Sequence, residues 1–239
     1  MSSDRTSSAP SSSGRPAVPV PGRARGRFIT LEGPDGSGKT SQAARLRDRL
    51  AAARVPVLLV REPGGTTVGE RIRAILLDTS EVPARLDART DALLFHAARA
   101  QNVTEVIEPA LVRGVTVVAA RYADSTLAYQ GYGSGLPLDE LRALERFAIR
   151  DTRPDLTVIL DLPAEIGLGR KSPGETTRFE AHFDVAYHRR VREGFLALAV
   201  AEPGRFAVVD ATRPADETFA ALVAVVAERL PDLGERLRA

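Results

Sequence analysis

The fold of this chain is decided by the stretch Gly33-Pro34-Asp35-Gly36-Ser37-Gly38-Lys39-Thr40, which fills every fixed position of the pattern G-x-x-x-x-G-K-[ST]. Its glycines allow a tight turn in which successive backbone N–H groups, and the positive end of a following helix, point at phosphate oxygens. Lys39 would then meet the β- and γ-phosphates of a nucleoside triphosphate, and the Thr40 hydroxyl would ligate Mg²⁺. The chain has only two lysines, Lys39 and Lys171, which sets Lys39 apart from ordinary surface charge.

The segments on either side supply the strand and the helix that this motif requires. Residues 27–31 form an apolar run typical of a short buried strand, and residues 40–53 place Ala44, Leu46 and Leu50 toward a core. Further apolar runs predict strands at residues 57–60, 115–118, 157–160 and 207–209. Helical spacing predicts helices at residues 68–77, 90–112, 138–149, 163–171, 183–200 and 216–230. Short apolar strands that alternate with helices favour an α/β fold with a five-stranded parallel sheet covered on both faces.

Composition divides the 239 residues into one folded domain and two tails. Residues 1–26 are rich in Ser, Pro and Arg, so they cannot bury enough surface to offset the entropy of ordering and are expected to be disordered. The folded domain is expected at residues 27–231, followed by a C-terminal tail at residues 232–239. Residues 1–27 hold five Arg and one Asp, which leaves 28 basic and 30 acidic residues in the remainder. The basic pI therefore belongs to the tail, and we expect no nucleic acid partner for the domain.

Several other classes of protein are disfavoured. No stretch approaches 18 consecutive apolar residues, so we expect no membrane span, and the first residues lack the apolar segment of a secretion signal. Their Ser- and Arg-rich composition overlaps with that of organelle transit peptides, which is an alternative for the tail. The chain has no cysteine, which excludes disulfides and thiolate metal sites and favours a cytoplasmic location.

Polar residues gather in the loops after the predicted strands, where the ligands of parallel α/β sheets bind. The loop at residues 120–135 is dense in aromatic, hydroxyl, amide and guanidinium groups, and Arg121 near its start is placed to grip a phosphate with two N–H groups. A salt-bridged arginine beside packing tyrosines is the structural alternative. On the helix at residues 90–112, Phe95 and Arg99 share a face and could stack a nucleobase and bond its edge, or be core and surface residues.

A third cluster lies between two predicted helices. It places three cations around a Pro-Gly break, namely Arg170, Lys171 and Arg178. Such a segment could close over phosphates as a lid. A solvated charged loop is the alternative.

The order of these motifs strongly resembles that of bacterial thymidylate kinases. GPDGSGKT is followed by REPGGT, FHAAR, ARYADSTLAYQGYG, TRPD with VILDL, GRK and TRFE, from about residue 27 to residue 230. The phosphate loop alone is shared by many families, whereas REPGGT together with AYQGYG is much more specific. The resemblance implies a P-loop nucleoside monophosphate kinase-like three-layer fold, ATP and dTMP as substrates, Mg²⁺ as cofactor and a homodimer.

The resemblance also implies the roles of the residues on the acceptor side. Asp35 would contact the sugar near its 3′-hydroxyl and join Thr40 at the metal, and Arg121 would hold the phosphate of dTMP. The remaining contacts would come from Pro63 through a cis bond, Phe95 stacked on thymine, Arg99 and Thr126 at its polar edge, Ser125, Tyr129 crowding a 2′-hydroxyl, and Gln130 near the base.

On the donor side the resemblance implies that catalytic charge comes from Lys39, Arg121 and the lid. Members of the family carry a catalytic arginine either in the phosphate loop or in the lid, and residues 34–37 contain no arginine. The resemblance therefore implies the lid-arginine type, in which Arg170, Lys171 and Arg178 supply the catalytic positive charge. Residues 210–213, with Thr212 and Arg213, resemble the loop that lines the adenine site.

Two positions depart from the family pattern. Ala120 stands where the family usually has Asp before the arginine of its D-R-[YFH] motif, and Thr177 stands where the lid often has Asp. A degenerate nucleotide-binding relative with low turnover is therefore one alternative. A deoxynucleoside kinase is another, with Glu62 as the base for a neutral hydroxyl. A guanine-nucleotide switch is disfavoured, because the single Asn of the chain, Asn102, is not part of an N-K-x-D motif.

Overall fold

A computed structural model describes residues 24–77, 86–170, 179 and 183–238 of the chain. Its centre is a sheet of five parallel strands in the order β2-β3-β1-β4-β5. The strands are β1 (Phe28–Glu32), β2 (Val57–Arg61), β3 (Thr116–Ala120), β4 (Leu156–Asp161) and β5 (Phe206–Asp210). This confirms the α/β fold and the five-stranded parallel sheet expected from the sequence.

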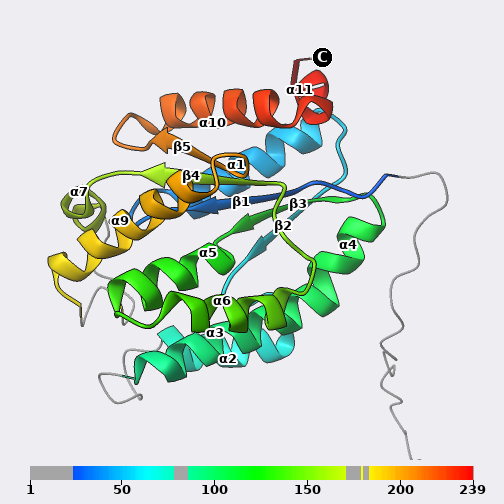
Figure 1. Ribbon diagram of the computed structural model, residues 1–239. Helices are drawn as coiled ribbons and strands as arrows, with labels where there is room; N and C mark the ends of the chain where they lie inside the picture. Colours follow the sequence, from blue (N-terminus) through cyan, green and yellow to red (C-terminus); the bar gives the residue numbers. More distant parts are fainter. Residues whose placement is uncertain (1–23, 78–85, 171–178, 180–182, 239) are drawn as a thin grey trace, which may run out of the picture.

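Helices cover the sheet on both faces and complete three layers (Figure 1). One face carries α1 (Lys39–Ala52), α10 (Ala215–Arg229) and α11 (Pro231–Arg238). The other face carries α2 (Thr67–Leu77), α3 (Ala88–Asn102), the π-helix η1 (Val103–Ile107), α4 (Glu108–Val112), α5 (Ala123–Thr126), the π-helix η2 (Leu127–Gly133), α6 (Leu138–Ile149) and α9 (Val185–Ala201). Helix α7 (Ala164–Gly169) lies beyond the carboxyl end of β4 (Figure 1). The helix expected at residues 90–112 thus corresponds to α3, η1 and α4 in succession.

The strands read as continuous apolar runs because the sheet is buried on both faces. Along β1, Ile29 and Leu31 pack with Leu46 and Leu50 of α1, whereas Phe28 points to the opposite face. All five residues of β1 are buried. The central strand is therefore anchored from both sides, which fixes the position of the loop that follows it.

The C-terminal segment differs from the expected tail at residues 232–239. Residues 231–238 form α11, in which Leu233 and Leu237 are buried in the same core as α1 and α10. Their spacing from Leu230 follows one helical face, which is the sequence pattern of an amphipathic helix. The tail prediction was therefore wrong at this end. Most of the expected N-terminal tail, residues 1–23, lies outside the described residues.

Within the described ranges, none of the helices is both long enough and apolar enough to cross a membrane.

Candidate functional site

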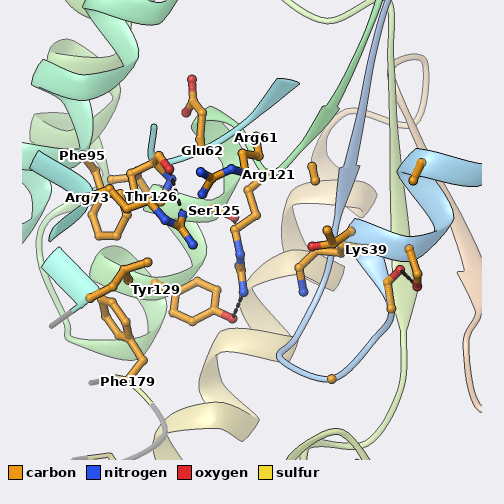
Figure 2. A pocket seen from close by; sticks show the side chains of 18 of the residues that line it. Lys39, Arg61, Glu62, Arg73, Phe95, Arg121, Ser125, Thr126, Tyr129 and Phe179 are labelled. Carbon is orange, nitrogen blue, oxygen red and sulfur yellow. Dashed lines mark hydrogen bonds between the residues drawn. The ribbon is translucent and has the colours of Figure 1, made fainter. Parts of the chain in front are cut away.

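A cavity of about 840 Å³ opens beyond the carboxyl ends of β1, β2 and β3 (Figure 2). This is the edge at which parallel α/β sheets bind ligands. Its walls come from the phosphate loop and α1, from the loops after β2 and β3, and from α2, α3 and η2. The lining residues are Gly36, Gly38, Lys39, Thr40, Ser41, Ala44, Arg61, Glu62, Pro63, Arg73, Leu77, Phe95, Ala120, Arg121, Ser125, Thr126, Tyr129, Gln130, Arg170 and Phe179.

The phosphate loop has the strand-loop-helix context that its motif requires. Gly36 and Gly38 adopt positive φ angles of 73° and 84°, which a residue with a side chain rarely adopts. Helix α1 begins at Lys39 with no side-chain cap and no acidic residue in its first turn, so its N-terminal N–H groups remain available to an anion. The loop and the helix end therefore form an electropositive cradle.

The Lys39 ammonium lies inside this cradle rather than on the surface. Its Nζ donates to the carbonyl oxygen of Gly33 at 2.9 Å, to that of Pro34 at 2.6 Å and to Oγ of Ser37 at 3.2 Å. Lys39 is 6% exposed and lines the cavity. A buried cation that borders a cavity of this kind attracts a phosphate group.

Arg121 projects into the opposite part of the cavity. Its guanidinium donates to the Asp35 carboxylate, to the hydroxyl of Tyr129 at 3.1 Å and to Oγ of Ser125 at 3.3 Å, and the Tyr129 hydroxyl in turn donates to Asp35 at 2.8 Å (Figure 2). The Arg121 backbone has a φ of 71°, a conformation that costs on the order of 1 kcal/mol for a residue other than glycine. This strained conformation directly after β3 holds the Arg121 guanidinium group in the cavity.

Asp35 supplies the carboxylate that Ala120 does not. Ala120 ends β3 and lines the cavity, 5% exposed, next to Arg121. The phosphate loop is close enough for Asp35 to take the Arg121 guanidinium directly. The guanidinium is therefore oriented from a different strand end than the family pattern implies.

Glu32 stabilises the turn after β3 instead of contacting Arg121. Its carboxylate accepts the Tyr122 N–H and the Ser125 hydroxyl, both at 2.6 Å. Burial raises the pKa of Glu32 to about 7, and the nearby negative charge of Asp124 adds to this shift. Asp124 is itself paired with Arg205, at 2.7 and 2.9 Å. Of these three acids, Asp35 alone has a hydrogen bond from Arg121 among the described residues.

Introducing the family's carboxylate through Ala120→Asp is therefore expected to lower activity. The new charge would be buried close to Asp35 and Glu32, and like charges in one site disfavour ionisation. We expect kcat/KM for the acceptor that the resemblance implies, measured at limiting Mg²⁺, to fall by about 2- to 10-fold, roughly 0.4–1.4 kcal/mol, with Ala120→Asn as the uncharged control. A rise in kcat/KM for Ala120→Asp alone would show that the missing carboxylate leaves a functional gap.

The loops after β2 and β3 and helix α3 form an aromatic part of the cavity beside Arg121. The Glu62–Pro63 peptide bond is cis, as the resemblance implied. Phe95 lies 6.0 Å from Phe179 between ring centroids, and Tyr129 lies 5.8 Å from Phe179 with its ring nearly perpendicular. Thr126 and Gln130 add polar groups at this end. A flat base fits such a wall better than an extended chain does.

Arg99 stands behind this wall and does not line the cavity. Its side chain is 1% exposed, and its guanidinium donates to Glu62 at 2.8 Å, to the Tyr122 carbonyl at 3.0 Å and to the Thr126 hydroxyl at 3.1 Å, with His96 Nδ1 at 3.1 Å. Four of its five N–H groups are therefore engaged. Arg99 thus holds Glu62 and Thr126 in place, and its expected direct contact with a base edge stays a prediction.

Of the remaining residues predicted on the donor side, the structure describes Arg170, Thr212 and Arg213. Arg170 lines the cavity and donates to the Ala211 carbonyl at 2.9 Å and to the Thr212 carbonyl at 3.3 Å. Thr212 and Arg213 do not line the cavity, and both side chains bond Asp210. The predicted lid residues Lys171, Thr177 and Arg178 lie outside the described residues.

Among the aromatic and cationic residues of the cavity, three were not identified as site residues from the sequence. Phe179 completes the aromatic wall, and Arg61 and Arg73 add two cations next to Pro63. Arg73 donates to the Pro63 carbonyl at 2.8 Å, and burial together with neighbouring Arg61 lowers its pKa from the usual range for arginine. The only available signal was the position of both arginines, because Arg61 is the first residue of REPGGT and Arg73 follows seven residues after the motif ends.

Comparisons with known proteins agree with this geometry. The sequence model of the thymidylate kinase family matches residues 31–222. The thymidylate kinase of Deinococcus radiodurans is 52% identical over 206 residues, which cover 86% of this chain and 98% of the relative. A thymidylate kinase of Pseudomonas fluorescens is 48% identical over 89% of this chain and 99% of the relative.

A solved structure points the same way. The crystal structure of thymidylate kinase from Ehrlichia chaffeensis aligns with a TM-score of 0.68 at 32% identity, over 84% of this chain and 99% of that one. The fold is thus that of a P-loop nucleoside monophosphate kinase, and the match extends over nearly the whole folded domain. By sequence and by fold, the chain belongs to the thymidylate kinase family.

Proposed function

We propose that this enzyme transfers the γ-phosphoryl group of ATP to dTMP, giving ADP and dTDP, by direct in-line attack. The observation that carries the proposal is the single cavity with Lys39 in the phosphate cradle at one end and Arg121 beside an aromatic wall at the other. The first end suits the phosphates of a donor nucleotide. The second end suits a phosphate joined to a flat base.

The residues of the cradle fit a magnesium ion. The Thr40 hydroxyl borders the cavity and Asp35 lies in the same loop, and hard oxygen ligands of this kind suit Mg²⁺. Within the described parts of the chain, no group of three or more His, Cys, Asp or Glu side chains could hold a metal. Mg²⁺ commonly takes one or two protein ligands together with phosphates and water, so this sparse set is appropriate. The ion would supply charge neutralisation at the transferring phosphoryl group.

The acceptor needs no strong general base. A phosphate monoester is already an anionic nucleophile, so the protein contributes alignment and charge stabilisation, from Lys39, Arg121 and Arg170. We assign the phosphate of dTMP to Arg121 and the stacking of thymine to Phe95. Ser125, Thr126, Tyr129 and Gln130 would contact sugar and base, and Arg99 would act by holding Thr126 in place.

The two alternatives from the sequence find less support. A deoxynucleoside kinase would need Glu62 as a base, but Glu62 is 5% exposed and accepts hydrogen bonds from Arg99 at 2.8 Å and from Asn102 at 3.3 Å. The hypothesis of a degenerate relative depended on the missing carboxylate at Ala120, and Asp35 provides a carboxylate for Arg121. Both observations favour an active kinase of a phosphorylated acceptor.

The choice of acceptor tests the proposal directly. With Mg-ATP, we expect dTMP to give dTDP, whereas thymidine should be turned over at least about 10³-fold less efficiently, because the half-buried Arg121 guanidinium is left without its anion. Coupled ADP release, measured across dTMP, dUMP, thymidine and AMP, gives the comparison. Turnover of thymidine above that of dTMP would assign the chain to nucleoside kinases instead.

A homodimer in the cytoplasm is part of the same proposal. Phe147 on α6 is 86% exposed, and Leu93 on α3, which contacts α6, is 55% exposed. Exposed large apolar side chains of this kind would be covered in a subunit interface. A chain without cysteine is in keeping with a reducing compartment.

A further inference from the structure

Helix α7 touches the phosphate loop through bare backbone. A Cβ atom on Gly167 would stand 2.1 Å from the carbonyl oxygen of Asp35, and a Cβ atom on Gly36 would stand 1.9 Å from the carbonyl oxygen of Gly167. Real Cβ atoms essentially never approach another heavy atom within 3.0 Å. Both neighbours are backbone atoms, which no change of rotamer can move aside. Glycine is therefore the only residue that fits this contact from either side.

The contact joins the donor cradle to a catalytic cation. The Gly167 carbonyl oxygen also accepts the N–H of Arg170 at 3.2 Å, and Arg170 is the point at which the chain leaves α7 and borders the cavity. The same peptide unit therefore faces Gly36 of the loop and fixes the start of Arg170. A displacement here would change the distance between the loop amides and the Arg170 guanidinium.

The contact also reaches the acceptor end. Asp35 meets Gly167 through its carbonyl oxygen, and its carboxylate holds Arg121. On the side of the sheet, a Cβ atom on Gly33 would stand 2.4 Å from the Leu160 carbonyl oxygen of β4. The loop is thus enclosed by β4 and by the helix that follows β4, which leaves little room for it to shift.

We propose that Gly167 is a positioning residue for phosphoryl transfer, which sets the phosphate loop against Arg170 and Asp35 by close backbone packing. The inference rests on the proposed function, because the aligned groups are those of the kinase reaction. Misplacement of reacting groups by about 1 Å can lower a rate about 100-fold. A methyl group at Gly167 needs a shift of this size to reach an ordinary contact distance.

The test compares Gly167→Ala with Gly169→Ala. Both substitutions replace glycine by alanine in α7 at positions without a positive φ, but no described side chain or distant backbone atom lies within 4 Å of a Cβ on Gly169. We expect Gly167→Ala to weaken ADP binding at least tenfold by calorimetry and to lower kcat about 100-fold. Gly169→Ala should stay within twofold of the wild type in both measurements. A Gly167→Ala variant that melts earlier but matches Gly169→Ala in ADP affinity and kcat would overturn the proposal.

A second measurement, made on the wild type, tests the proposal even if Gly167→Ala does not fold. In the wild type, ADP with Mg²⁺ should slow amide exchange in residues 164–169 together with residues 33–40, because the two backbones move as one unit. Protection of residues 33–40 without residues 164–169 would contradict the proposal. Failure of the proposed function is distinguishable, since it would appear as a wild type that forms no dTDP, while ADP binding and exchange still report on the contact.

Discussion

Replacing Lys39 with Met is expected to lower kcat by about 10³-fold, equivalent to roughly 4 kcal/mol of transition-state stabilisation. The Lys39 ammonium is buried in the phosphate cradle, and buried donors aimed at developing charge contribute more than they would in water. Met keeps most of the apolar stem and removes the charge. The measurement is steady-state formation of dTDP at saturating ATP and dTMP.

The same substitution also removes contacts within the loop, so binding has to be separated from catalysis. Lys39 donates to the Gly33 and Pro34 carbonyl groups, and a loosened loop would weaken ADP binding as well. Arg45→Met is the matched control, because it removes a partly exposed cation from the same helix, where Arg45 pairs with Asp216. We expect Arg45→Met to stay within about twofold of the wild type, in line with the small value of exposed ion pairs. A kcat for Lys39→Met within tenfold of the wild type would remove Lys39 from the mechanism.

Features that depend on neighbouring residues in the sequence were predicted well. The strand β2 covers Val57–Arg61 where residues 57–60 were expected, and the phosphate loop lies between β1 and α1 as its motif requires. A parallel sheet buried on both faces imposes continuous apolar runs, so its strands are visible in the sequence alone. The loops that follow these strands are then placed at the same edge of the sheet by topology.

Features that depend on distant partners were not predictable in this way. Helical spacing placed Phe95 and Arg99 on one face, but it could not show that Glu62, 37 positions away, would take the Arg99 guanidinium. The aromatic wall likewise needs Phe179, which a long segment separates from Phe95. Side-chain partners across a fold are chosen by packing and charge compensation, neither of which has a local period.

The role of Ala120 shows the same limit. From the sequence, its missing carboxylate pointed to a weakened active site. In the structure the positive φ of Arg121 turns its side chain toward the phosphate loop, where Asp35 is in reach. The carboxylate missing at the end of β3 is supplied by a residue of the loop after β1, and only the fold brings the two together.

Replacing Arg121 with Met is expected to lower kcat/KM for dTMP by about 10³-fold or more, with KM for ATP changed less than about threefold. The Arg121 guanidinium lies beside the aromatic wall and can donate two parallel hydrogen bonds to a phosphate. Methionine has no N–H group on its side chain, so this contact is lost entirely. Arg121→Lys should recover part of the loss, because it keeps the charge without the fork. The kinetic constants for both substrates, measured for both variants, separate the acceptor site from the donor site.

A structural role for Arg121 predicts a different result. Arg121 donates hydrogen bonds to Asp35 and Tyr129, so in a purely structural role its loss would act only by loosening that pair. The variant Tyr129→Phe keeps the ring and removes the hydroxyl, which bonds both Arg121 and Asp35. If Arg121 binds the phosphate of dTMP, Arg121→Met should be at least about 30-fold worse than Tyr129→Phe, because removing a charged partner costs more than removing one neutral hydrogen bond. Equal losses in the two variants would mean that Arg121 only holds the side chains around it, and the acceptor phosphate would then have to be assigned to Arg73.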